Sequence, residues 1–64
     1  MNIGNLVTRN DVVKFLNDNK NHIKNINGVE TIDGEEIGIL FNNGTTLTLT
    51  IIDGEVDFIG GNYV

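Results

Sequence analysis

The sequence predicts an α+β fold in which one N-terminal helix packs on a three- to four-stranded antiparallel β-meander. Three observations support this fold class. Apolar residues recur at helical spacing after Thr8, residues 45–52 alternate apolar and β-branched polar side chains, and Asn-Gly or Asp-Gly turn dipeptides recur after residue 28. With 64 residues, we expect a single small domain over residues 1–64. A domain of this size buries only about 60% of the surface that its unfolded chain exposes.

The helix is predicted to begin at Arg9. Thr8 is a suitable N-cap, and Asp11 three residues later completes a capping box. An apolar stripe follows on one side of the chain, formed by Val12, Val13, Phe15 and Leu16, with Ile23 and Ile26 in phase further on. This spacing predicts a helix over about residues 9–25. Residues 17–21 are polar on every side and rich in Asn, a poor helix former, so an end near Asn19 is the alternative.

Four strands are predicted, near residues 29–32, 36–41, 45–52 and 55–60. Between the second and the third, a three-residue loop over residues 42–44 pairs Ile39 with Leu47 and Ile37 with Leu49. A two-residue loop would instead mix apolar and polar side chains on both faces of the sheet. The three-residue loop therefore gives one apolar face, which we expect the helix to cover.

The third and fourth predicted strands join at an Asp-Gly dipeptide, residues 53–54. A two-residue type I′ turn at this point pairs Ile51 with Val56 and Leu49 with Phe58. All four side chains then lie on the apolar face. This register predicts that Phe58 belongs to the core.

Two segments keep alternatives open. In the first hairpin, with its turn at residues 33–34, one register places Val29 inward and the other places Ile32 inward. The C-terminal residues 60–64 are either flexible, or they dock Tyr63 and Val64 on the sheet or on a partner.

Charge is unevenly distributed along the chain. The net charge is −5, but residues 1–28 carry four basic and two acidic side chains (+4 − 2 = +2), whereas residues 29–64 carry seven carboxylates and no Lys or Arg (−7). We therefore expect an acidic sheet half and a mildly basic helical half. Such a sheet disfavours direct nucleic-acid binding, because contacts to phosphates need clustered Lys and Arg. The acidic sheet instead favours binding to a basic surface on another protein.

The face of the sheet away from the helix is the candidate partner-binding surface. We expect threonines and carboxylates on this face, with outward Leu40, Ile52 and Ile59 as apolar anchors. The candidate partner-binding residues are Glu35, Glu36, Leu40, Ile52, Asp53, Glu55, Asp57 and Ile59.

The sequence lacks the residues that most catalytic and metal sites need. It contains no Cys or Ser, and His22 is the only histidine, so the usual zinc ligand sets and the commonest nucleophiles are missing. The acidic spacing over residues 53–57 resembles a calcium-binding loop, but Phe58 occupies the position of its glycine and Val64 that of its closing carboxylate. We therefore predict no catalytic, cofactor or metal site and no enzymatic activity.

Two functions from different classes are consistent with these observations. The first is a non-enzymatic protein-binding module that inhibits a host or defence factor. The abundance of Asn and Ile and the absence of Ala and Pro indicate AT-rich coding, as in a low-GC bacterium, its phage or another mobile element. The second is a structural or assembly subunit, such as a homodimer, that self-associates through a sheet edge, because neither predicted edge strand carries the Pro or Lys that discourages pairing.

The cellular setting follows from residues that are absent. Without cysteines, and with apolar runs of only a few residues, we expect a cytoplasmic protein that makes no contact with a membrane and binds no cofactor.

Overall fold

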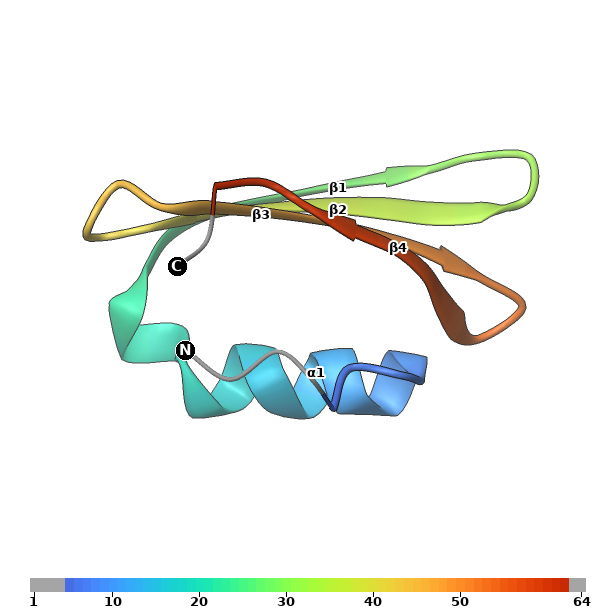
Figure 1. The fold of residues 1–64 in the computed structure, drawn as a ribbon, viewed down its shortest axis with the longest axis horizontal. Helices are drawn as coiled ribbons and strands as arrows, with labels where there is room; N and C mark the ends of the chain where they lie inside the picture. Colours follow the sequence, from blue (N-terminus) through green and yellow to red (C-terminus); the bar gives the residue numbers. More distant parts are fainter. Residues whose placement is uncertain (1–4, 63–64) are drawn as a thin grey trace.

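The computed structural model describes residues 5–62, and it has two layers. Helix α1 lies across one face of a four-stranded antiparallel sheet whose strands follow one another in the order β1-β2-β3-β4 (Figure 1). We call the covered face the inner face and the opposite one the outer face. The predicted α+β class is confirmed. The elements are α1 (Arg9–Asp18), a 3₁₀ turn η1 (Lys20–His22), β1 (Ile23–Glu30), β2 (Gly34–Phe41), β3 (Thr46–Ile52) and β4 (Glu55–Gly60).

Helix α1 begins with the predicted capping box. The Thr8 hydroxyl accepts a hydrogen bond from the Asp11 amide at 3.2 Å, and the Thr8 amide donates to the Asp11 carboxylate at 2.9 Å. At the other end, the Asn19 amide and side chain both donate to the Phe15 carbonyl, at 3.0 and 2.9 Å. These bonds close the last turn, because an Asn side chain competes for helix carbonyls. The helix ends at Asp18, so the extension to residue 25 is wrong and the alternative end near Asn19 is confirmed.

Strand β1 begins at Ile23, where the helical spacing of apolar residues had suggested more helix. The strand contains a β-bulge, since Ile23 pairs with Phe41 but Asn25 pairs with Leu40. The extra residue lets two isoleucines three positions apart share the inner face, as they would on a helix. The apparent helical period of this segment therefore comes from a bulged strand.

The register between β2 and β3 confirms the predicted three-residue loop. Ile39 pairs with Leu47 and Ile37 pairs with Leu49. The loop closes with a hydrogen bond of 2.9 Å from the Phe41 amide to the Thr45 carbonyl. Its glycine, Gly44, has a φ of 87°, the left-handed conformation that this type of loop requires.

The hairpin of β3 and β4 begins as predicted and then departs from the prediction. Asp53 and Gly54 have φ angles of 52° and 78°, as a type I′ turn requires, and Ile51 pairs with Val56. A bulge at Asp57 then shifts the register by one residue. Every later side chain of β4 consequently lies on the opposite face to the one predicted.

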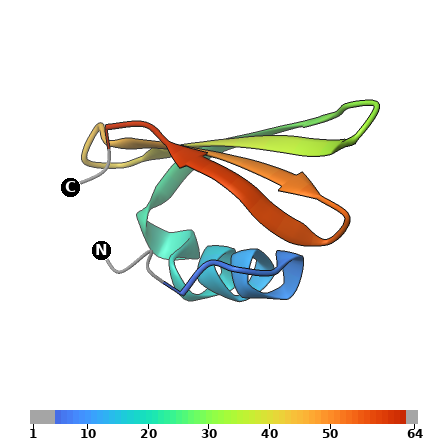
Figure 2. The ribbon, with the colours of Figure 1, turned by 45° about the vertical axis from the view of Figure 1, so that its right-hand side comes forward.

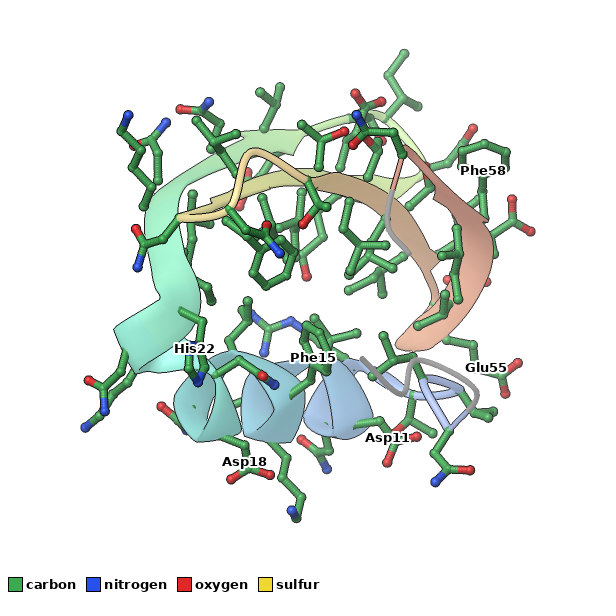
Figure 3. The ribbon with its side chains drawn as sticks, turned by 60° about the vertical axis from the view of Figure 1, so that its left-hand side comes forward. Asp11, Phe15, Asp18, His22, Glu55 and Phe58 are labelled. Carbon is green, nitrogen blue, oxygen red and sulfur yellow. The ribbon has the colours of Figure 1, made fainter. Side chains whose placement is uncertain are left out.

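The bulge exchanges the positions of two apolar side chains. Leu49 pairs with Ile59 rather than with Phe58, so Ile59 lies on the inner face and packs against the core. Phe58 pairs with Thr50, points away from the helix and is 55% exposed (Figure 3). Its ring lies over Gly60, where an added Cβ would be 2.7 Å from a ring carbon. The predictions that Phe58 points inward and that Ile59 points outward are therefore both wrong.

The first hairpin follows neither of the two registers that the sequence left open. Val29 pairs with Glu36 on the outer face and is 63% exposed, and Ile32 lies fully exposed in the turn. The Thr31 amide donates to the Gly34 carbonyl at 2.8 Å, so the turn is formed by residues 32–33, one position earlier than predicted. Gly34 is therefore the first residue of strand β2 and does not belong to the turn.

The core lies between α1 and the inner face. Its buried side chains are Leu6, Val12, Phe15, Ile39, Phe41, Leu47, Leu49 and Ile51. Phe15 meets Phe41 edge to face, with ring centroids 6.4 Å apart. Near the C-terminus, the Asn62 side chain accepts hydrogen bonds from the Thr46 amide and hydroxyl at 2.6 and 2.8 Å. The predicted alternatives for Tyr63 and Val64 lie outside the described residues.

Candidate protein-binding surface

The two Asp-Gly segments of the chain lie at the same end of the sheet. In a meander, the first and third turns meet at one end, and the pairing of Gly34 with Ile52 places them side by side (Figures 1 and 2). All seven carboxylates of the second half of the chain belong to these turns or to the strand residues beside them. We call this set the acidic end: Glu30, Asp33, Glu35, Glu36, Asp53, Glu55 and Asp57.

The charge of the protein is therefore divided along the strands. The acidic end includes one cation, Arg9 at the start of α1, and has a formal charge of −7 + 1 = −6. The remaining charged residues sum to +3 − 2 = +1, and Lys20 and Lys24 lie at the opposite end, beside His22. The expected division into an acidic sheet and a basic helix is replaced by an acidic end and a weakly basic end.

One predicted partner-binding carboxylate is engaged within the molecule. Arg9 Nε lies 2.7 Å from Glu35 Oε1, and Glu35 is on the inner side of the sheet, where its side chain is 28% exposed. The Arg9 amide also donates to the Gly54 carbonyl at 2.8 Å, so the start of α1 is attached to both hairpins. Glu35 thus joins the helix to the sheet, and its carboxylate is already engaged within the molecule.

The other carboxylates of the acidic end are exposed. Glu36 is on the outer face, Asp53 lies in the turn, Glu55 opens β4 and Asp57 is the bulged residue. Within residues 5–62, none of these four carboxylates takes part in a side-chain hydrogen bond or ion pair. They are accessible to solvent or to a partner.

The apolar residues of the surface differ in part from those predicted. Leu40 and Ile52 are half-buried on the outer face, and only Ile52 is at the acidic end. Ile59 lies on the inner face because of the bulge, so it is not a surface anchor. The exposed apolar side chains beside the carboxylates are Val29, Ile32 and Phe58. Strict alternation along β4 places Phe58 on the inner face. The bulge moves it to the outer face, so the sequence pattern did not identify it as a surface residue.

A hollow of about 320 Å³ lies between the two hairpins at the acidic end. It is lined by Arg9, Glu30, Thr31, Gly34, Glu35, Ile51, Asp53 and Gly54. Within the part of the chain that the structure describes, no three His, Cys, Asp or Glu side chains are grouped closely enough to hold a metal ion. His22 is exposed in η1.

Comparisons with protein-family models, curated proteins and solved structures give no match. The surface itself is therefore the basis for a functional proposal. No helix within residues 5–62 has the length and apolar character needed to cross a bilayer.

The two edges of the sheet differ in accessibility. The start of β4 is covered by residues 7–9, since the Val56 amide donates to the Val7 carbonyl at 2.7 Å and Thr8 forms a bridge with Glu55. Strand β1 has no neighbouring strand on the edge away from β2 within the described residues, and all of its residues after Ile23 are exposed. Since β1 includes Lys24, the expectation that no edge strand carries a Lys is wrong.

Proposed function

We propose that the protein is a non-enzymatic protein-binding module whose acidic end docks on a basic surface of another protein. The observation that carries this proposal is the gathering of seven carboxylates at one end of the sheet, where Arg9 is the cation paired with one of them. A concentrated field of one sign attracts an oppositely charged surface over a distance of about 8–10 Å at physiological salt. It accelerates encounter and orients the partner before contact.

The apolar side chains beside the carboxylates support a specific contact rather than attraction alone. Phe58 is 55% exposed and Val29 is 63% exposed on the outer face, and Ile32 is exposed at the tip of the first hairpin. Binding energy in protein interfaces is concentrated in a few well-packed side chains, aromatic residues are enriched there, and the surrounding rim is polar. Phe58 is therefore the anchor that replaces Ile59 of the sequence prediction.

The chemistry of the acidic end also favours one class of partner surface. A groove that binds nucleic acid is lined by Lys and Arg placed to contact a row of phosphates. The exposed carboxylates of the acidic end can supply negative charge to the same groove. By occupying the groove, the protein would exclude the nucleic acid and inhibit the partner. The composition bias indicates a low-GC bacterium, its phage or another mobile element as the origin of the chain. The proposed partner is therefore a host or defence factor of such a bacterium.

The experiment starts with the immobilised wild-type chain, to which soluble proteins of a low-GC bacterium are bound at low salt. A salt gradient releases the bound proteins, and one purified partner is then titrated by calorimetry against two variants. Glu36→Gln with Asp57→Asn removes two exposed carboxylates of the acidic end. Asn17→Lys with Asn21→Lys changes the net charge by the same amount on exposed positions away from that end.

We expect the carboxylate variant to bind at least about tenfold more weakly, because charge pairs across an interface contribute about 1 kcal/mol or more each. The lysine variant should keep most of the affinity, and nucleic acid should compete with the wild-type chain. Equal affinities of the wild-type and carboxylate variants, or an affinity that does not change between low and high salt, would refute the proposal.

A further inference from the structure

Within residues 5–62, strand β1 offers a row of backbone groups with which no other strand pairs. The Thr31 amide donates to the Gly34 carbonyl, which marks a hydrogen-bonded pair of the β1–β2 ladder. Because such pairs alternate in an antiparallel ladder, the N–H and C=O groups of Asn25, Asn27 and Val29 point toward β2. The N–H and C=O groups of Ile26, Gly28 and Glu30 point away from β2, in the plane of the sheet and at its edge. A second strand can bind these outward groups.

We propose that two copies of this chain pair antiparallel through β1, about a two-fold axis that passes beside Asn27. In this register Ile26 of each copy forms a hydrogen-bonded pair with Gly28 of the other, and Lys24 of each copy lies across from Glu30 of the other. The sheets of two four-stranded copies then form one continuous sheet of eight strands. The inference does not depend on the acidic end having a partner.

Charge complementarity selects this arrangement. Lys24 lies near the start of β1 and Glu30 is its last residue, and both are exposed. Antiparallel pairing about Asn27 brings opposite charges together twice, whereas parallel pairing would place like charges side by side. An antiparallel register displaced by two residues puts Glu30 across from His22 or from Ile26 and leaves Lys24 without a carboxylate. The Lys that normally protects an edge strand is thus neutralised in a single register.

The environment of Glu30 within one copy supports the same conclusion. Glu30 lies directly across from Glu35 in the β1–β2 ladder, a like-charge pair that destabilises a sheet. The guanidinium of Arg9 is engaged with Glu35 at 2.7 Å. The cation that Lys24 of a second copy would bring is therefore complementary to a carboxylate that has an acidic neighbour.

Side-chain size also fits the proposed register. Ile26 pairs with Ile39 on the inner side of β1, yet it is 47% exposed. Gly28 lies on the same side, and no atom is within 4 Å of the position that its Cβ would take. Pairing Ile26 with Gly28 therefore places a large exposed side chain next to open space. Both copies bury part of an isoleucine at the two-fold contact.

The experiment is sedimentation velocity over a concentration series, with charge-reversal variants of the two paired residues. Lys24→Glu places two carboxylates together, and Glu30→Lys places two ammonium groups together. Each reversal acts twice in the symmetric dimer, and we expect each to raise the dissociation constant at least about tenfold relative to a dimerising wild-type chain. An equimolar mixture of the two variants restores both opposite-charge pairs, so it should form a heterodimer. The double variant should form a homodimer again.

Two controls separate the edge contact from net charge. Lys14→Glu and Asp18→Lys change the net charge by the same amounts on the exposed side of α1, and both should leave the dimer unchanged. A wild-type chain that is monomeric at every concentration would overturn the inference, as would single variants that dimerise as well as wild type. Circular dichroism checks that each variant is folded. If a single variant is not folded, the double variant decides, because its failure to dimerise while folded also overturns the inference.

Discussion

Gly34 is the position at which the closeness of the two hairpins is most directly testable. A Cβ added at Gly34 would lie 1.9 Å from the Ile51 carbonyl oxygen and 3.0 Å from its carbonyl carbon. Both are backbone atoms of the central strand β3, so they cannot rotate away as the end of a side chain can. In Gly34→Ala, strands β2 and β3 must therefore separate at the acidic end.

The magnitude can be judged against the stability of a small domain. Forcing one extra carbon into a packed site costs about 1–3 kcal/mol. At about 0.05–0.15 kcal/mol per residue, the whole chain is stable by only about 3–10 kcal/mol. Gly38→Ala is the matched control, because Gly38 is in the same strand and no atom lies within 4 Å of its added Cβ. It should stabilise the chain by about 0.4–1 kcal/mol through the unfolded state.

The assay is urea denaturation followed by circular dichroism, at one protein concentration for wild type and both variants. With an m value of about 1 kcal/mol/M, the midpoint of Gly34→Ala should fall by about 1–3 M, and that of Gly38→Ala should rise slightly. Equal midpoints for the two variants would refute the reasoning, because the same chemical change would then have the same effect in open and closed surroundings.

Two further predictions use the same denaturation assay. Leu49→Ala, at a side chain with no exposed surface, should lower the free energy of unfolding by about 2–5 kcal/mol, and Phe58→Ala should lower it clearly less, because Phe58 is 55% exposed; equal losses would contradict the bulged register. The amides of Thr8 and then Val7 donate to the Asp11 carboxylate and hold its pKa below the ordinary value. The stabilisation by Asp11 is therefore complete above its unfolded pKa and is lost as the pH falls through the folded pKa, so Asp11→Asn should reduce the acid-induced loss of stability. Parallel losses in wild type and Asp11→Asn would contradict this assignment.

The register of the central hairpin was predictable because a slip of one residue would expose side chains that are otherwise buried. A shift of one residue between β2 and β3 would move Leu47 and Leu49 to the outer face. Both side chains have no exposed surface in the structure. The cost of exposing them far exceeds any preference of the loop, so alternation alone determined the loop length.

The two bulges were not predictable, because each inserts one residue at a small cost that local sequence does not display. The bulge near Lys24 gave Ile23 and Ile26 a helical spacing, and this produced the wrong end of the helix. The bulge at Asp57 placed Ile59 against Leu49 and Phe58 over Gly60. In both cases the packing of the finished sheet decided which side chains are buried.

The acidic end could have been predicted in outline from the turns. An antiparallel meander places alternate turns at opposite ends, so two Asp-Gly segments separated by one Asn-Gly loop must lie at the same end. The role of Glu35 could not be predicted in this way. Its pairing with Arg9 depends on where the helix begins relative to the sheet, which is a property of the tertiary structure.

Solubility alone does not account for the distribution of charge at this end. A soluble surface needs a modest net charge with both signs interspersed, and such a surface avoids repulsion between neighbours. Here Glu30 faces Glu35 across the ladder, and Arg9 is paired with Glu35, whereas Glu36, Asp53, Glu55 and Asp57 have no ion pair within residues 5–62. In a domain with so small a core, that repulsion removes a share of a narrow stability margin. We therefore propose that partners supply the missing positive charge: a basic protein for the acidic end, and Lys24 of a second copy for Glu30.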